Sequence, residues 1–162
     1  VQIVNSDFDE PLFDKASFDL IFCNMGLQWS MNLEYTLSLF HNYLRDGGVF
    51  AFSIPVNDTF LELREDYRNS FYTDSVIVEL LNAVGYQTVA EEIISLTERF
   101  ETPIEALRSI KAVGANCQFD SDQIRAKKMT RQDLSKAFRN LEDVCLSYQI
   151  AVFVLKKNRG AL

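Results

Sequence analysis

The 162-residue sequence is poor in the residues that most often build metal sites and disulfide frameworks. It has a single histidine, His41, and three scattered cysteines, Cys23, Cys117 and Cys145, with no CxxC pair. Transition metals in proteins are held mainly by closely spaced cysteines and histidines, so we expect no such metal site. An odd number of scattered cysteines favours a reducing compartment, and we therefore expect a cytoplasmic protein.

Long apolar runs and loop-forming residues are scarce as well. No stretch approaches the roughly 20 apolar residues that a membrane-spanning helix needs, and the basic-then-apolar pattern of a signal peptide is missing. We expect no membrane partner. The sequence has only 3 Pro and 6 Gly, whereas 48% of its residues are hydrophobic. This composition predicts one folded domain over residues 1–162, with little disorder.

Basic residues are few in the first two thirds of the chain. Residues 1–107 hold 5 Lys and Arg against 18 Asp and Glu, whereas residues 108–139 hold 8 against 3, and the net charge is −7. A mainly acidic chain is not typical of a nucleic-acid-binding protein, and we expect no such partner. The basic segment, residues 125–139, could present a local basic patch to an acidic partner; a solvated helix surface is the simpler interpretation.

The clearest pattern is an alternation of apolar strands and amphipathic helices. Residues 18–23 are almost continuously apolar, which suits a buried strand. Asn32 is placed to cap a helix that Asp46-Gly47-Gly48 would end, and residues 49–54 form a second apolar strand. Strand, helix and strand predict a βαβ unit with a right-handed crossover. Ligands bind at the carboxyl ends of such strands, which makes residues 24–29 the first candidate site.

The other expected elements can be given in order. They are a strand at residues 1–4, a short helix at 58–65, a helix at 74–84 ended by Gly85, a bent strand at 87–100, a helix at 103–113 that starts with the capping box Thr102-Pro103-Ile104-Glu105, a surface loop at 117–129, a helix from residue 130 with Leu134, Ala137, Phe138 and Leu141 as its apolar stripe, and a strand at 147–157.

Three segments together resemble the class I methyltransferases that use S-adenosylmethionine. They are NSDFDEPLF at residues 5–13, SFDLIFCNMGLQW at 17–29 and LRDGGVFAFSIP at 44–55. Within that superfamily, the QW pair and LRSIKAVGAN at residues 107–116 resemble the BioC family. Members of that family are malonyl-acyl-carrier-protein O-methyltransferases of biotin biosynthesis. The resemblance covers essentially the whole chain, and LRSIKAVGAN is the segment that narrows it to this family.

The resemblance implies an α/β fold: the C-terminal part of a Rossmann-like class I methyltransferase sheet, with family strands 3 to 7, helices on both faces and a helical insertion. The family's glycine-rich cofactor loop has no counterpart here, so the chain looks N-terminally truncated. In the family order 3-2-1-4-5-7-6, strands 4, 5, 7 and 6 stay contiguous. We therefore expect residues 1–4 to be frayed, re-paired or swapped. Residues 18–23 should form an exposed apolar edge through which chains associate.

The same resemblance implies where the cofactor lies. Asp7 and Phe8 match the position that meets adenine, where a carboxylate can accept the exocyclic amine and a ring can pack. A capped, solvated turn is the alternative. Asn24 and Met25 match the strand end beside the methionine portion of the cofactor, and a helix-capping turn is the alternative there. Without the glycine-rich loop, we expect the 162-residue chain alone to bind S-adenosylmethionine weakly or not at all.

Candidate substrate residues come from two places. Gln28 and Trp29 follow the first apolar strand, although Trp29 could equally belong to the core. Arg108 and Lys111 share a helix face and could bind the free carboxylate of a malonyl group, or could simply be solvated. Tyr148 and Tyr72 are weaker candidates for an acyl pocket. His41 and Cys23 are expected to be structural, since the apolar neighbours of Cys23 do not favour a thiolate.

The implied reaction needs no catalytic side chain. A carboxylate is ionised at neutral pH and can attack a sulfonium methyl directly, once the reacting atoms are aligned. The product would be the methyl ester of a malonyl thioester, carried on acyl carrier protein or on coenzyme A. Two alternatives stay open. A related branch with the QW turn includes mitochondrial complex I assembly factors that hydroxylate arginine, and a chain without the cofactor loop could be a non-catalytic binding fragment.

Overall fold

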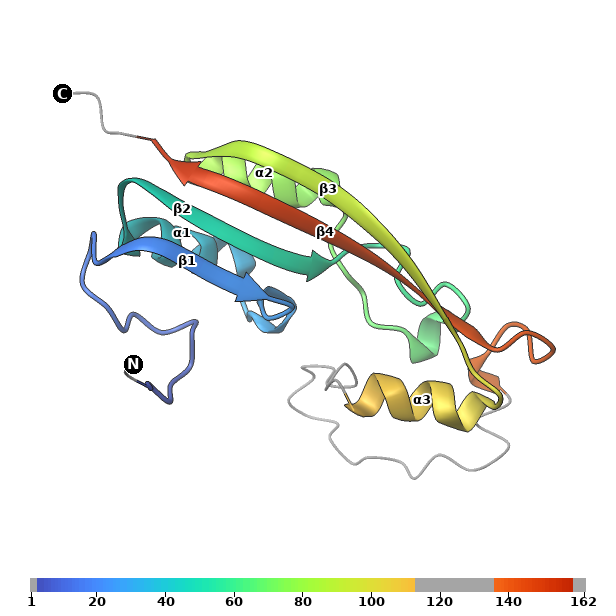
Figure 1. Ribbon diagram of the computed structural model, residues 1–162. Coiled ribbons are helices and arrows are strands. Elements are labelled where there is room, and N and C mark those ends of the chain that lie inside the picture. The colour runs from blue at the N-terminus through green and yellow to red at the C-terminus, as the bar shows by residue number, and fades with distance from the viewer. Residues whose placement is uncertain (1–2, 113–135, 159–162) are drawn as a thin grey trace. The chain divides into compact units, whose positions relative to one another are not determined.

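The computed structural model describes residues 3–112 and 136–158 (Figure 1). The chain divides into two compact units, a larger one (Val1–Asn57, Tyr72–Ile94, Ile150–Leu162) and a smaller one (Asp58–Phe71, Ser95–Gln149). The elements in chain order are β1 Phe18–Asn24, η1 Leu27–Trp29, α1 Leu33–Tyr43, β2 Leu44–Pro55, η2 Glu65–Tyr67, α2 Asp74–Val84, β3 Tyr86–Arg99, α3 Pro103–Ala112 and β4 Cys145–Lys157.

The strands form one mixed sheet in the order β1-β2-β4-β3 (Figure 1). β1 and β2 are parallel, and β4 runs antiparallel to β2. If β1, β2, β3 and β4 correspond to family strands 4, 5, 6 and 7, this is the contiguous block 4-5-7-6 that the resemblance implied. The predicted order of the sheet is therefore confirmed.

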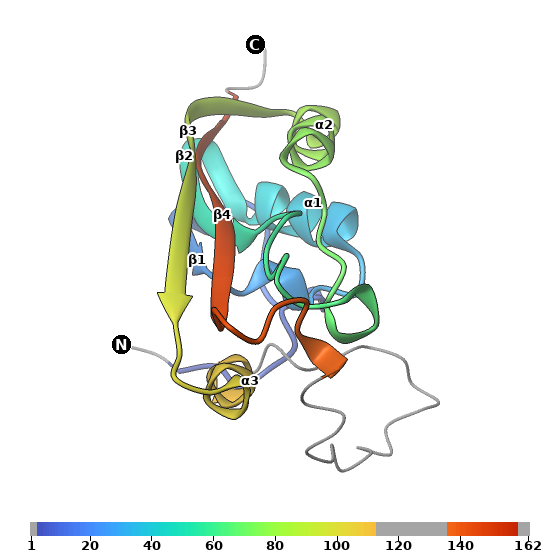
Figure 2. The same ribbon diagram turned by 90° about the vertical axis from the view of Figure 1, so that its right-hand side faces the viewer.

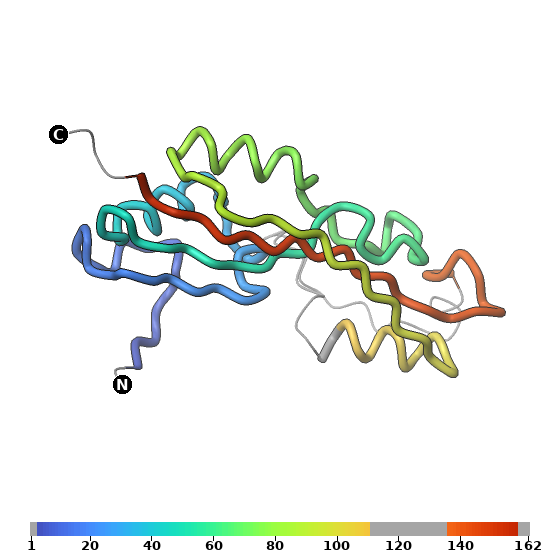
Figure 3. Tube along the Cα trace, turned by 45° about the horizontal axis from the view of Figure 1, so that its top comes forward, coloured from blue at the N-terminus to red at the C-terminus, as the bar shows by residue number. Residues whose placement is uncertain are grey.

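The strand expected at residues 1–4 is not formed by Ile3 and Val4. Both have irregular backbone, and 91% of Ile3 and 48% of Val4 are exposed; Val1 and Gln2 lie outside the described residues. The chain runs from there through irregular backbone to β1 (Figure 3). β1 is the edge strand, with Leu20 60% and Phe22 72% exposed. The exposed apolar edge is thus confirmed.

Helix α1 is held at both ends by side chains. At its start, Asn32 Oδ1 accepts the Tyr35 backbone N–H over 3.0 Å. At its end, Lys157 Nζ donates to the carbonyls of His41 and Leu44, each over 2.9 Å. A cation at the last carbonyls of a helix also interacts favourably with the helix dipole. These contacts fix the crossover between β1 and β2.

Helix α2 follows the same rules. Thr73 Oγ1 accepts the Val76 N–H over 3.3 Å, and Gly85, with φ of 99°, ends the helix in the left-handed conformation. Glycine has no Cβ to oppose that conformation. The helix predicted at residues 74–84 is confirmed with its bounds.

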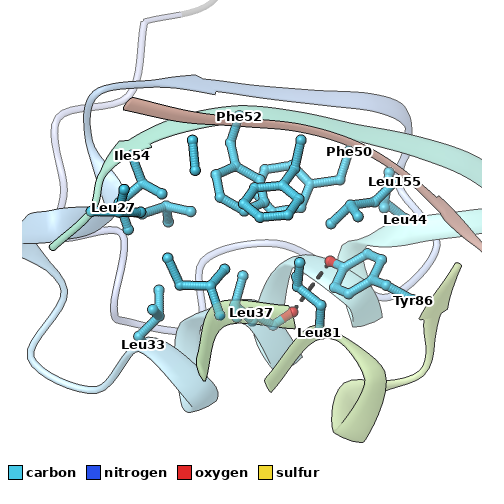
Figure 4. Close-up of a cluster of buried hydrophobic side chains, with 14 residues drawn as sticks. Leu27, Leu33, Leu37, Leu44, Phe50, Phe52, Ile54, Leu81, Tyr86 and Leu155 are labelled. Carbon is cyan, nitrogen blue, oxygen red and sulfur yellow. Dashed lines mark hydrogen bonds between the residues drawn. The ribbon is translucent and has the colours of Figure 1, made fainter. Parts of the chain in front are cut away.

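The core of the larger unit lies between the sheet and both helices. Side chains of Phe50 and Phe52 point from β2 toward Leu37 of α1 and Leu81 of α2, and the Tyr86 hydroxyl donates to the Leu37 carbonyl over 3.3 Å (Figure 4). Both helices lie on the same side of these strands (Figure 2). We expected helices on both faces of the sheet. In the described part of this unit, α1 and α2 both lie on one face (Figure 2).

The turn into β2 is tighter than predicted. α1 ends at Tyr43 and β2 starts at Leu44, so Asp46-Gly47-Gly48 lies in a bulged start of the strand rather than in a helix stop. Gly47 has φ of 77°. A Cβ on Gly48 would come within 2.8 Å of the Arg45 carbonyl oxygen and 3.3 Å of the Asp19 carbonyl oxygen. Only glycine lets these backbones approach so closely.

The smaller unit contains α3 and its own core. Thr102 Oγ1 accepts the Glu105 N–H over 3.3 Å, as the capping box predicted. Leu63 and Phe138 form an isolated antiparallel bridge, and both are buried. The buried core residues are Phe60, Leu63, Ala106, Ile110, Ala137, Phe138, Val144 and Leu146.

Two predictions for this unit were wrong. Residues 58–64 form turns and a bridge instead of a helix, because Asp58 and Phe60 adopt left-handed backbone with φ of 68° and 61°. Leu141 is 50% exposed, so it does not continue the apolar stripe of the buried Ala137 and Phe138. The loop predicted at 117–129 and Leu134 lie outside the described residues.

Candidate functional site

The carboxyl ends of the parallel strands β1 and β2 meet at Asn24 and Ser53, which are paired in register. The Ser53 hydroxyl donates to Asn24 Oδ1 over 2.6 Å. The Met25 N–H approaches both the Ser53 carbonyl oxygen, at 3.0 Å, and the Ser53 hydroxyl, at 3.1 Å. Asn24 itself is exposed, whereas Ser53 is buried. Ser53 therefore holds the Asn24 amide with its oxygen engaged, which leaves the Asn24 NH2 group to serve a ligand.

The turn after β1 has a strained and crowded backbone. Met25 has φ of 50°, and a Cβ on Gly26 would lie 2.8 Å from Cys23 Sγ. The following 3-10 turn, η1, buries Leu27 and leaves Trp29 half-buried. A non-glycine residue at positive φ is uncommon, and such positions cluster at binding sites.

Gln28 carries the one orphaned acceptor of this turn. Its Nε2 donates to the Met25 carbonyl over 2.7 Å, which fixes the side-chain amide. Its Oε1 is buried, and no hydrogen-bond partner for it exists in the part of the chain that the structure describes. A buried acceptor without a partner costs free energy. A donor from a bound molecule would relieve that cost.

Asp7 and Phe8 lie in the acidic turn before β1. The Asp7 carboxylate is exposed, and its Oδ1 accepts the Asp9 N–H over 2.9 Å. Phe8 is half-buried at an apolar cavity of about 260 Å³. The cavity is lined by Phe8, Leu12, Phe13, Phe18, Leu20, Ile21, Phe40 and Tyr43. Asp7 therefore keeps one carboxylate oxygen for a ligand, while Phe8 contributes to an apolar surface beside it.

Sequence reasoning missed Asp9. Its Oδ2 accepts the Met31 N–H over 2.7 Å, and its Oδ1 accepts the hydroxyl of the fully buried Thr36. These bonds connect the acidic turn to the start of α1. The role of Asp9 could not be predicted from local sequence, because its hydrogen-bond partners are distant in sequence. The same is true of Ser53. Only the alternation of acidic residues, Asp7 and Asp9, marked this turn in the sequence.

Two titratable groups in the larger unit behave as structural residues. Burial raises the pKa of Cys23, an effect that the backbone N–H groups of Gly26 and Leu27 partly offset. The thiol is therefore protonated at neutral pH. The His41 ring packs edge-on against Tyr86 with centroids 4.9 Å apart. Burial and the charge of Lys157 lower the pKa of His41, as expected of a packing residue.

The candidate substrate residues belong to different parts of the chain. Arg108 is exposed on α3; Lys111 lies on the same helix, and its side chain is outside the described residues. Tyr148 is half-buried in the smaller unit with its ring 5.0 Å from Phe60. Burial raises the pKa of Tyr148, and its hydrogen bond with Ser109 partly offsets this.

The remaining sequence candidates are more exposed or less complete. Tyr72 is 50% exposed in the larger unit. Of the basic segment 125–139, Lys136 and Arg139 are described, and both are exposed. The other basic residues of this segment lie outside the described residues, and so does Cys117.

Residues 3–112 and 136–158 contain neither a cluster of metal ligands nor a membrane-spanning helix. Within these ranges, no three His, Cys, Asp or Glu side chains come together as ligands for a metal ion. Nor does any helix within them have the length and apolar character to cross a bilayer.

Comparison with known proteins identifies relatives along nearly the whole chain. A family model described as a methyltransferase domain matches residues 1–52. Malonyl-acyl-carrier-protein O-methyltransferase 2 of Coxiella burnetii is 41% identical over 157 residues, which is 97% of this chain and 61% of that protein. Along nearly its whole length, the chain is thus similar to the malonyl-acyl-carrier-protein O-methyltransferases.

The homologues extend beyond one organism. The malonyl-acyl-carrier-protein O-methyltransferase of Enterobacter lignolyticus is 26% identical over 165 residues, covering 96% of this chain and 64% of that protein. The chain thus spans about three fifths of the length of these curated homologues. The family-level resemblance noted in the sequence is confirmed.

Solved structures confirm the fold. A Bacillus halodurans C-125 structure described as an inferred methyltransferase matches with a TM-score of 0.66 and 11% identity, over 98% of this chain and 78% of that one. SpnF, a cyclase, matches with a TM-score of 0.60 and 14% identity, over 96% of this chain and 56% of its own. The chain has part of an α/β class I methyltransferase fold. Because one fold carries different reactions, the activity has to be argued from sites.

S-adenosylmethionine is the cofactor of this methyltransferase superfamily, and the residues present fit it. Its amino-acid end carries an ammonium group, a donor of the kind that the buried Gln28 Oε1 lacks. Its carboxylate can accept from the Asn24 NH2 group that Ser53 orients. Asp7 Oδ2 can accept an exocyclic amine, and the Phe8 ring can pack on a purine.

Proposed function

We propose that this chain is part of an S-adenosylmethionine-dependent O-methyltransferase that converts the free carboxylate of a malonyl thioester to its methyl ester in biotin biosynthesis. The thioester would be carried by acyl carrier protein or by coenzyme A. The observation that carries the proposal is the 41% identity to the Coxiella burnetii enzyme over 97% of the chain. The polar groups at the ends of β1 and β2 support it, because their chemistry matches the cofactor.

In this proposal the larger unit binds the cofactor. Asn24, Met25 and Gln28 would hold its amino-acid end, and Asp7 and Phe8 its adenine. The bound cofactor supplies an electrophilic methyl group. Met25 would act through its backbone carbonyl, which already orients Gln28. The Ser53 hydroxyl keeps the Asn24 amide in place, so that less side-chain entropy is lost on binding.

The protein's task on the substrate side is alignment and exclusion of water. The malonyl carboxylate is ionised at neutral pH, so no side chain has to remove a proton. Gln28 and Trp29 are proposed to lie beside the reacting carboxylate, and Tyr148 to line the acyl pocket. Arg108 and Lys111 are proposed as cations for the substrate. The basic segment 125–139 is proposed to dock an acidic carrier protein.

The proposal also covers the domain content of the chain, its cellular location and its self-association. Residues 1–162 are proposed to be a single methyltransferase domain without the glycine-rich loop, inactive by itself. The two free cysteines described, Cys23 and Cys145, support a cytoplasmic location. The exposed Leu20 and Phe22 on β1 support association between chains at this edge.

A methyl-transfer assay tests the proposal. The full-length protein, meaning the longest natural polypeptide that contains these residues, is incubated with S-adenosylmethionine and malonyl-acyl carrier protein, and in parallel with malonyl-coenzyme A. We expect mass spectrometry to show the gain of one methyl group on at least one of them. Acetyl thioesters, which have no free carboxylate, are the control. Absence of the gain on both malonyl thioesters contradicts the proposal, and gain of one oxygen on a protein arginine would favour the hydroxylase alternative.

A further inference from the structure

Arg68, in the smaller unit, carries an unpaired buried donor. Its Nη1 is buried, and among the described residues no group accepts a hydrogen bond from it. The side chain as a whole is half-buried. A guanidinium is always charged, and a buried donor of a charged group is costly when it has no acceptor. The position is therefore suited to an anion that arrives with a ligand.

The backbone around Arg68 is firmly held, so the side chain starts from a fixed point. The Arg68 N–H donates to the Glu65 carbonyl over 3.1 Å, closing the short turn η2. The Arg64 N–H donates to the Ala137 carbonyl, and the Arg139 N–H to the Glu62 carbonyl, both over 2.9 Å. A guanidinium on such a support loses less entropy when it binds a ligand.

Nearby carboxylates do not neutralise Arg68. Glu65 and Asp66 are exposed, although they are close in sequence. Both Glu62 carboxylate oxygens accept from Ser147, one from its N–H over 3.0 Å and the other from its hydroxyl. The ion pairs between described residues are Arg45–Asp19 and Arg99–Asp143, and Arg68 is in neither. The smaller unit thus has a half-buried cation whose counter-charge its described residues do not supply.

We propose that Arg68 binds the free carboxylate of the malonyl group and sets the preference for malonyl over acetyl thioesters. This rests on the proposed function, which supplies a substrate with a free carboxylate. The planar guanidinium can hold a carboxylate through two parallel hydrogen bonds, and burial strengthens them. Arg108, the sequence candidate for this role, is exposed, so water would weaken the same contact there.

The test compares Arg68→Met with wild type in the full-length protein. Calorimetric titration with malonyl-acyl carrier protein and acetyl-acyl carrier protein, each in the presence of S-adenosylhomocysteine, measures the preference directly. We expect Arg68→Met to weaken malonyl binding by about 10–100-fold and to leave acetyl binding unchanged. In the methyl-transfer assay, KM should rise more than kcat falls, and Arg68→Lys should recover part of the loss.

Stability separates this role from a structural one. Removing a buried unpaired donor should leave Tm unchanged or raise it by about 2–4 °C in the absence of substrate. Arg64→Met is the matched control, because Arg64 is exposed on the same segment, and it should change neither preference nor Tm. Equal weakening of malonyl and acetyl binding, or a lowered Tm with the malonyl preference intact, would overturn the proposal.

The titrations also keep this inference separate from the proposed function. If wild type binds malonyl over acetyl but transfers no methyl group, the reaction is wrong while Arg68 is still tested by its variant. If wild type methylates the malonyl thioester and Arg68→Met does so with the same KM, the reaction stands and the assignment of Arg68 fails.

Discussion

The Ser53 hydroxyl donates to Asn24 Oδ1 over 2.6 Å, joining the carboxyl ends of two parallel strands through their side chains. Ser53 is buried, while the amide that it orients is exposed. A buried hydroxyl thus controls which end of an exposed amide is available to a ligand. This relationship gives the candidate cofactor site a defined pattern of donors and acceptors before any ligand binds.

Ser53→Ala should weaken cofactor binding more than it weakens the fold. The variant loses the bond to Asn24 Oδ1 and the contact with the Met25 N–H. One hydrogen bond contributes about 0.5–1.5 kcal/mol net, so we expect the Kd of S-adenosylhomocysteine for the full-length protein to rise about 3–10-fold. Isothermal titration calorimetry measures it. Ser38→Ala, which removes a hydroxyl bonded within α1, is the control, and equal Kd values for Ser53→Ala and wild type would argue against the site.

Gly48→Ala should destabilise the larger unit. The added Cβ would come within 2.8 Å of the Arg45 carbonyl oxygen and 3.1 Å of Leu44 Cδ2, so backbone has to move. Overpacking of this kind costs about 1–3 kcal/mol, which urea unfolding can measure. Gly47→Asn should cost less, because asparagine tolerates the left-handed backbone at φ of 77°. A Gly48→Ala variant as stable as wild type would contradict the close approach of the backbones.

Phe22→Lys should reduce self-association of the 162-residue chain. Phe22 is 72% exposed on the edge strand β1, and Leu20 beside it is 60% exposed. A lysine on an edge strand opposes pairing with another strand. We expect sedimentation velocity to show dimers or larger species for wild type at micromolar concentration and mainly monomers for Phe22→Lys. Tyr35→Lys, at a 46% exposed position on α1, is the control. A monomeric wild type would refute association at this edge.

Acid should destabilise the protein partly through His41. Burial and Lys157 lower its pKa in the folded state, although Asp46 and a backbone bond to Gly85 partly oppose this. The unfolded chain, with a histidine pKa of about 6.5, therefore binds the proton more readily. The contribution of His41 to the free energy of unfolding is therefore complete above about pH 6.5. It is lost as the pH falls toward the pKa of His41 in the folded protein, by no more than about 1.4 kcal/mol per pH unit for one proton.

Urea unfolding at several pH values checks the role of His41. His41→Gln should show a shallower fall in the free energy of unfolding between pH 7 and pH 5.5 than wild type. The two proteins should respond alike between pH 7.5 and pH 8.5, where a neutral histidine does not titrate. Parallel curves for wild type and variant over the acidic range would contradict the lowered pKa.

The sequence predicted best those features that depend on neighbouring residues. The cap of α1 by Asn32, the left-handed stop at Gly85 and the capping threonine Thr102 are bonds within one helical turn. The sheet order came from the family resemblance. The helix expected at 58–65 failed because long-range contacts decide this segment: the Phe60 N–H donates to the Ser147 carbonyl over 2.7 Å. No local pattern contains that partner.

In the candidate site, too, features set by neighbouring residues were predicted, whereas features set by long-range contacts were not. Asn24 and Gln28 were identified because they follow an apolar strand, where ligands bind in open sheets. Their orientation could not be predicted, since Ser53 comes from the next strand and is distant in sequence. Arg68 could not be singled out either, because its sequence neighbours Glu65 and Asp66 suggest an ordinary solvated ion pair. That Arg68 Nη1 is buried without a hydrogen-bond acceptor among the described residues can be seen only in the folded structure.

The carboxylate of Asp9 has a consequence for how variants of this protein should be interpreted. It binds the Met31 N–H and the Thr36 hydroxyl, so both of its oxygens are engaged within the protein. It joins the turn of Asp7 and Phe8 to the start of α1. Under the proposed function, a genetic screen for lost methyl transfer would therefore recover Asp9 alongside the residues proposed to touch the ligand. Isosteric replacement with asparagine, compared with alanine, would distinguish loss of that link from loss of a ligand contact.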